Sequence, residues 1–106
     1  MINYEVLISP EFQKEFYKLE KYLQERVRKI LKKLEAYPCG EPLLGDLKGF
    51  YSVHFESNHY RLIYAKEENV LKILALHVGK RTNDFYKKFK EELKRRAKYQ
   101  NFTSHI

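Results

Sequence analysis

The stretch from Gly49 to Tyr86 constrains the fold most, because it has the pattern of three consecutive antiparallel strands. Each predicted strand is rich in β-branched and aromatic residues, and turn-forming dipeptides stand between them. The strands are expected at Gly49–Glu56, His59–Lys66 and Val70–Val78, with turns at Ser57-Asn58 and Glu68-Asn69. This pattern predicts a small sheet around which the rest of the chain packs.

A two-residue turn at Ser57-Asn58 would fix which residues face each other on the first two strands. His54 then lies opposite Arg61, with Cβ atoms about 5 Å apart. Side chains alternate between the faces of a strand. One face, expected to be the core, carries Tyr51, Val53, Phe55, Tyr60, Leu62 and Tyr64. The other face carries Ser52, His54 and Arg61, so an imidazole and a guanidinium are predicted side by side there.

The N-terminal third predicts a strand at Tyr4–Ser9 followed by helix. Ser9-Pro10 is a helix-start signal, and apolar residues then recur at helical spacing as far as Leu34. One straight helix from Pro10 to Tyr37 would be about 42 Å long, whereas a domain of this size is about 33 Å across. We therefore expect a break near Glu20–Leu23 and a helical hairpin on the sheet, although a single bent helix meets the same limit.

The remaining segments complete an α+β fold with an antiparallel sheet packed by an N-terminal helical hairpin. The order is β-α-α-β-β-β, followed by a C-terminal helix. A loop is expected at Ala36–Gly45, where prolines and glycines gather, and the apolar strand Val70–Val78 is expected inside the sheet. Thr82 or Asn83 caps a final helix over Asp84–Lys98. A single domain over residues 1–98 and a flexible tail over 99–106 are predicted.

The charge is strongly positive and unevenly spread. The 106 residues hold 21 Lys and Arg against 14 Asp and Glu, a net charge of +7. Residues 14–33 have eight basic and three acidic side chains, and residues 80–98 have nine and three. Two basic helices beside a near-neutral sheet suggest a polyanionic partner, either nucleic acid or an acidic protein. The alternative is two ordinary solvated helix faces.

Several classes of protein are disfavoured. Cys39 is the one cysteine, so no intrachain disulfide forms, and an incidental loop cysteine is expected rather than a reactive thiol. We see no signal-peptide pattern and no apolar run of about 20 residues, so a cytoplasmic protein without membrane contact is expected. The histidines lack the spacing of metal ligands, and neither a metal nor a cofactor is expected. They are His54, His59, His77 and His105.

What remains is a cationic cluster suited to metal-free RNA cleavage, in which the ribose 2′-OH attacks the phosphodiester. Imidazoles as a class exchange protons near neutral pH, so His54 is a candidate to accept the 2′-OH proton. Arginine forks, at Arg61 and Arg81, can stabilise charge on the phosphoryl oxygens. An aromatic ring, at Tyr86, can stack on an unstacked base. Each residue also has an ordinary alternative: a surface histidine, an arginine paired with Glu56 or Asp84, and a packing tyrosine.

The segment from Asp46 to Tyr86 resembles the RelE branch of the RelE/ParE toxin superfamily. The matching pieces are L-K-G at 47–49, S-x-x-Y-R-L-I-Y at 57–64, and V-G-K-R at 78–81 with a tyrosine five residues later. The resemblance implies the toxin of a type II toxin–antitoxin system that cuts mRNA in the ribosomal A site. It implies a cognate antitoxin, ribosome and mRNA as partners, and operator DNA bound through the antitoxin.

The same resemblance assigns roles to residues. Arg61 and Arg81 resemble the arginines that stabilise the scissile phosphate, and Tyr86 resembles the tyrosine that stacks on the nucleotide. RelE-type members carry two lysines where this chain has Ser52 and His54, so His54 is expected to replace the lysine base. RNA contacts are expected at Lys48, Ser52, Lys80, Lys87 and Lys88. The rival expectations are a ParE-like DNA gyrase inhibitor and a catalytically decayed RNA-binding or antitoxin-binding module.

Overall fold

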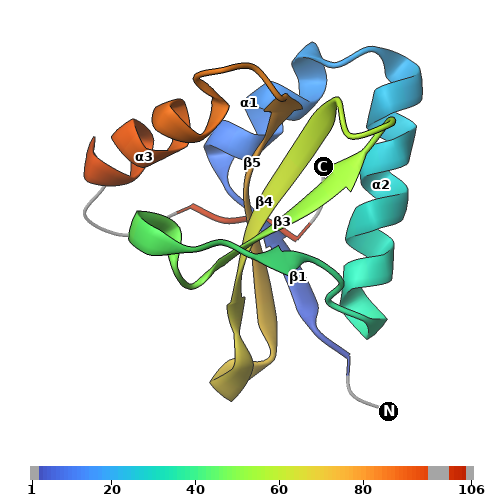
Figure 1. Cartoon of the computed structure of the whole chain (residues 1–106). Coiled ribbons are helices and arrows are strands. Elements are labelled where there is room, and N and C mark those ends of the chain that lie inside the picture. The colour runs from blue at the N-terminus through green and yellow to red at the C-terminus, as the bar shows by residue number, and fades with distance from the viewer. Residues whose placement is uncertain (1–2, 96–100, 105–106) are drawn as a thin grey trace.

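The computed structural model describes residues 3–95 and 101–104, which form an α+β fold around one five-stranded sheet (Figure 1). The strands are β1 (Glu5–Ile8), β2 (Glu41–Pro42), β3 (Phe50–Phe55), β4 (Tyr60–Glu67) and β5 (Lys72–Lys80). The helices are α1 (Pro10–Lys18), α2 (Lys21–Ala36) and α3 (Phe85–Arg95), with 3₁₀ turns η1 (Gly45–Leu47) and η2 (Glu68–Val70). The predicted fold class is confirmed.

The strand order is β1-β5-β4-β3-β2, and one pairing differs from the prediction. β1 runs parallel to β5, with Glu5 opposite Lys72 and Ile8 opposite Ala75, so the sheet is mixed and not wholly antiparallel. The chain leaves β1 through the helical hairpin and builds the hairpin strands before β5 returns beside β1. The expected loop Ala36–Gly45 also contains β2, which pairs Glu41 with Ser52 on β3.

The predicted break in the long helix is present. Leu19 and Glu20 both have extended backbone, with ψ of 153°, and they separate α1 from α2. The Ser9 side chain caps α1 by accepting a hydrogen bond from the Phe12 N–H at 3.0 Å. The longest dimension of the described molecule is 38 Å, which is less than a single straight helix would need.

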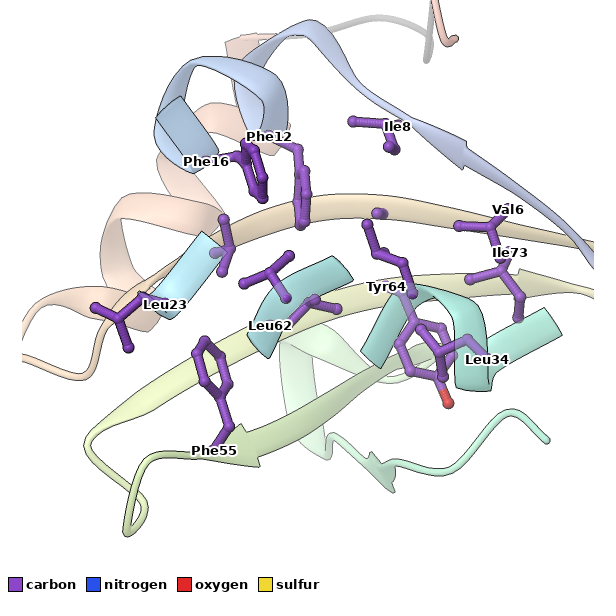
Figure 2. Close-up of a cluster of buried hydrophobic side chains, with 14 residues drawn as sticks. Val6, Ile8, Phe12, Phe16, Leu23, Leu34, Phe55, Leu62, Tyr64 and Ile73 are labelled. Atoms are coloured by element: carbon purple, nitrogen blue, oxygen red, sulfur yellow. The ribbon is translucent and has the colours of Figure 1, made fainter. Parts of the chain in front are cut away.

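The main core lies between the helical hairpin and one face of the sheet (Figure 2). Phe12 and Phe16 of α1 meet Leu62 of β4 there, and all three are fully buried. The predicted core face is confirmed, because Phe55, Leu62 and Tyr64 are buried and the other three residues pack at its edge, namely Tyr51, Val53 and Tyr60. The helical hairpin therefore covers the face of the sheet that does not carry His54 and Arg61.

The second face of the sheet is partly covered by α3. Phe85 and Phe89 of α3 are buried against β4 and β5, in a cluster that also holds Leu47, Ile63, Ala65, Leu74 and Leu76. β5 thus has apolar cover on both faces and lies inside the sheet, as predicted. It begins at Lys72 and not at Val70, because η2 and the left-handed Leu71 (φ 53°) intervene.

The C-terminal segment contributes a short pairing to the sheet. Thr103 exchanges two backbone hydrogen bonds with Ile8, of 2.7 and 3.0 Å, so this part of the predicted tail is attached to β1. The expected end of the last helix at 96–98, and tail residues 99–100 and 105–106, lie outside the described residues. Among the helices of the described ranges, none has the length and apolar character to cross a bilayer.

Candidate active site

The β3–β4 hairpin has the register that the sequence predicts. His54 pairs with Arg61, Val53 with Leu62, and Tyr51 with Tyr64. The turn closes through a hydrogen bond of 2.9 Å from the His59 N–H to the Glu56 carbonyl. Its central residues, Ser57 and Asn58, have φ of 53° and 69°, as a type I′ turn requires. The imidazole and the guanidinium therefore start from neighbouring positions on one face.

Arg61 is held close to this turn. Its residue is only 8% exposed, and Nη1 donates a 2.5 Å hydrogen bond to the Asn58 carbonyl. Nε is buried and has no hydrogen-bond partner in the described part of the chain. The two acids considered as its partners bond elsewhere: Glu56 pairs with Arg26 at 3.1 Å, and Asp84 accepts from Thr82 at 2.6 Å. The guanidinium is thus fixed in place by backbone oxygen.

α3 brings Tyr86 to the same face. The Tyr86 hydroxyl lies 3.4 Å from Ser52 Oγ, within hydrogen-bond range. Ser52 and His54 are two residues apart on β3, so their side chains share a face. Ser52 is buried, and its hydroxyl faces Tyr86 and not solvent, whereas His54 is exposed. The structure therefore gathers Ser52, His54, Arg61 and Tyr86 on one side of β3 and β4.

Lys80 is the last residue of β5, and Arg81 follows it. The Arg81 N–H donates to the His59 carbonyl at 2.7 Å, which ties Arg81 to the hairpin turn two residues from Arg61. Lys80 instead pairs with Tyr60, whose side chain packs on the helical-hairpin face. By alternation Lys80 starts on the face opposite His54. The backbone of Arg81 therefore lies next to the hairpin turn, and Lys80 occupies a register position on the helical-hairpin face.

The remaining predicted RNA contacts are exposed lysines around this cluster. Lys48 follows η1, which a 3.5 Å ion pair between Lys90 and Asp46 ties to α3. Lys87 and Lys88 lie on the solvent side of the first turn of α3, and Lys88 pairs with Asp84 at 3.6 Å. All three side chains are exposed and could meet a polyanion, since an exposed ion pair such as that of Lys88 contributes little to stability.

The family model for the ParE toxin of the type II toxin–antitoxin system, parDE, matches residues 6–85. The chain belongs to this family. It is therefore a toxin of the RelE/ParE superfamily, and both the fold and the superfamily expected from its motifs are confirmed. No curated protein sequence matches it.

Solved structures of RelE toxins share the fold of this ParE-family chain. The toxin–antitoxin complex RelBE2 from Mycobacterium tuberculosis is 24% identical, with a TM-score of 0.69, and the match covers 76% of this chain and 100% of that one. The intact RelBE complex of E. coli is 25% identical, with a TM-score of 0.65, covering 76% and 99%. A mutant of E. coli RelE in the free state is 22% identical, with a TM-score of 0.69, covering 86% and 98%.

In this toxin a groove runs along the edge of β3 beside the cluster. It has a volume of about 470 Å³ and is lined by Lys33 and Tyr37 of α2, by Glu41, and by Ser52 and His54. A second hollow of about 240 Å³ adds Arg26 and Lys29 and shares Lys33 and His54. The basic side of α2 thus reaches His54 around the sheet edge. The basic character of this helix is evident from the sequence, but its contact with β3 is not.

The start of α3 carries a negative charge in this toxin. The hydrogen bond from Thr82, together with the Lys88 ammonium, lowers the pKa of the Asp84 carboxyl below its usual range. A carboxylate before the first helical turn interacts favourably with the positive end of the helix dipole. Thr82 and Asp84 therefore fix the start of the helix that carries Tyr86.

Proposed function

We propose that this toxin is a ribosome-dependent mRNA endonuclease that works without a metal ion. The observation that carries the proposal is the placement of His54 beside Arg61, with Tyr86 on the same side and Arg81 bonded to the hairpin turn. A base, two arginines and an aromatic ring are the parts that cleavage by a 2′-OH requires.

In the proposed reaction, His54 accepts the proton of the 2′-OH, and the 2′ oxygen attacks the adjacent phosphorus. The bond from phosphorus to the 5′ oxygen breaks and that oxygen takes a proton from water, leaving a 2′,3′-cyclic phosphate on one product and a 5′-OH on the other; His54 later returns its proton to solvent. Arg81 binds the phosphoryl oxygens from the end of β5. Arg61, whose Nη1 donates to the Asn58 carbonyl, supplies a second positive charge to the phosphate.

Holding the RNA in a fixed position would allow these few side chains to catalyse its cleavage. The Tyr86 ring lies on α3, whose Phe85 and Phe89 anchor it to the sheet, so a base stacked on it would be held against β3. The basic groove formed by α2 and β3 gives the flanking RNA backbone a path. We also propose a cognate antitoxin as partner, supported by the relatives solved as RelBE toxin–antitoxin complexes.

The test uses purified toxin, ribosomes and an end-labelled message. Arg81→Ala should lower the single-turnover cleavage rate by about a hundredfold or more, because a charged transition-state contact is lost. Lys18→Ala is the matched control, since Lys18 is an exposed cation on α1 that belongs to no part of the cluster. If Arg81→Ala cuts as fast as Lys18→Ala, the assignment is wrong.

A second candidate is inhibition of DNA gyrase by binding, which the ParE family model favours. ParE-like inhibitors do without the cationic catalytic set, so His54, Arg61, Arg81 and Tyr86 argue for the nuclease. A supercoiling assay with the parent protein separates the two. Loss of supercoiling at toxin concentrations that leave ribosome-bound message intact would favour the gyrase function. A protein inert in both assays would be a decayed module.

A further inference from the structure

Three side chains with metal-ligating groups converge at β5, one strand beyond Arg61. Glu15 comes from α1, His77 from β5 and Glu92 from α3, and their ligand atoms all lie within 4.8 Å of one another. His77 is buried, and both carboxylates are half-buried. The proposed RNA cleavage uses none of the three.

A β-bulge explains how His77 comes to face α3. The β4–β5 register shifts between Ile63 and Tyr64, so that Ile63 faces His77 while Tyr64 faces Ala75. Leu76 is the extra residue, and a bulge of this kind lets two successive side chains lie on one face. The His77 ring then packs against Phe85 and Phe89, with ring centroids 4.4 and 5.6 Å away. The imidazole therefore has a fixed orientation.

The imidazole lies among aromatic rings, with the Glu15 carboxylate as a close polar neighbour. His77 is 6% exposed, and Glu15 Oε2 lies 2.7 Å from Nδ1. Even so, neither ring nitrogen has a well-directed hydrogen bond within residues 3–95 and 101–104. A buried polar atom in this condition is destabilising unless something else satisfies it. A cation between the ring and the carboxylates would do so.

Glu15 is oriented by the backbone. β1 ends at Ile8, opposite Ala75, so the edge of β5 beyond that point is open. The Val78 N–H on this edge donates to Glu15 Oε1 at 3.0 Å. A hydrogen bond to one carboxylate oxygen leaves the other, Oε2, directed at His77. Outer contacts of this kind are what orient ligands in metal sites.

We propose that Glu15, His77 and Glu92 form a binding site for a divalent transition-metal ion, with Zn²⁺ as the best match. One imidazole nitrogen and two carboxylates are ligands that zinc accepts at about 2.0–2.2 Å, whereas calcium and magnesium prefer oxygen alone. The bound ion would complete its shell with water. This proposal departs from the expectation that the histidines have no metal role, because spacing along the chain does not report ligands from three elements.

A metal ion here would join α1, β5 and α3. α3 rests on the sheet mainly through Phe85 and Phe89, and it carries Tyr86 near its start. Binding should therefore raise thermal stability and hold α3 against the sheet. This role is structural and independent of whether the protein cuts RNA.

The experiment uses the full chain with any affinity tag removed. Isothermal titration with Zn²⁺ should give one saturable site per chain and a rise in Tm of several degrees. Co²⁺, used as a spectroscopic substitute, should produce visible d–d absorption. Glu92→Gln should weaken Zn²⁺ binding at least tenfold and abolish the Tm rise. The apo Tm of that variant is measured as its own reference, so that loss of the Zn²⁺-induced rise is separated from any change in the apo fold.

Two further variants complete the test. His77→Gln should abolish Zn²⁺ binding, while His59→Gln, which changes an exposed histidine in the hairpin turn, should bind as the parent does. Mg²⁺ should not change Tm. The proposal is overturned if no saturable binding occurs, if Co²⁺ adds no visible absorption, or if Glu92→Gln and His59→Gln bind Zn²⁺ equally well.

Discussion

Replacing Arg61 by alanine should damage both the fold and the reaction, and the structure allows the two effects to be separated. Arg61 Nη1 donates to the Asn58 carbonyl at the tip of the β3–β4 hairpin. A hydrogen bond from a charged donor contributes about 1.5–3 kcal/mol. A domain of about 100 residues loses about 4–8 °C of Tm per kcal/mol. Arg61→Ala should therefore lower Tm by about 6 °C or more.

The hairpin tip needs this contact because it is strained. Glu56, Ser57 and Asn58 have φ of 50°, 53° and 69°, a left-handed run without a glycine. Such a conformation costs about 1–2 kcal/mol for a residue with a Cβ, and less for asparagine. Ser57→Gly should therefore recover about 1 kcal/mol of the free energy of unfolding in the Arg61→Ala background, without replacing the charge.

Chemical denaturation and single-turnover cleavage on ribosomes together distinguish the effect of Arg61 on the fold from its effect on the reaction. The double variant Ser57→Gly/Arg61→Ala should regain stability and remain inactive. Ser57→Gly alone is the control and should cut as the parent does. If the double variant regains cleavage along with stability, Arg61 acts by supporting the turn and not on the phosphate. If Arg61→Ala leaves Tm within about 2 °C of the parent, the hydrogen bond to Asn58 contributes less to stability than the range given above.

Three further outcomes are expected. A Cβ at Gly40 would lie 2.8 Å from the hydroxyl of fully buried Tyr64. Gly40→Ala should therefore lower the free energy of unfolding, measured by denaturation, by about 1–3 kcal/mol, and adding Tyr64→Phe should restore part of this loss. Burial raises the pKa of the Tyr64 phenol above its ordinary value near 10, so the folded state keeps this proton while the unfolded state loses it. This group therefore leaves the free energy of unfolding unchanged below pH 10 and lowers it by about 1.4 kcal/mol per pH unit above pH 10. Denaturation measured over this pH range should show the loss in the parent and not in Tyr64→Phe. Tyr86→Phe keeps the ring and should cut within a few-fold of the parent, whereas Tyr86→Ala should be nearly inactive; equal rates for both would remove the stacking role.

The sequence predicts those features that neighbouring residues control. The Ser57-Asn58 turn determines the β3–β4 register, so the pairing of His54 with Arg61 followed from local chemistry. The break at Leu19 and Glu20 followed from the size of the domain. The core face followed from alternation along β3 and β4. For the register and the core face the determining residues lie within a few positions of one another, whereas the helix break was predicted from chain length alone.

Features that depend on distant segments were not predictable. The parallel pairing of β1 with β5 joins residues far apart in sequence, and nothing in Glu5–Ile8 specifies direction. The bulge that turns His77 towards α3 appears only when β4 and β5 are aligned. The burial of Ser52 depends on Tyr86 reaching over β3. The pairing of Lys80 with Tyr60, which puts Lys80 at a register position on the helical-hairpin face, likewise appears only when β4 and β5 are aligned.

The role of His54 is tested most directly by changing that side chain alone. His54 is exposed, so its replacement should leave Tm nearly unchanged, and a change in rate then reports chemistry. The measurement is the single-turnover cleavage rate of ribosome-bound message by the parent, His54→Ala and His54→Lys. We predict a loss of about a hundredfold or more for alanine and substantial activity for lysine, the residue of RelE-type relatives. A His54→Ala variant that cuts as fast as the parent would contradict the proposed mechanism.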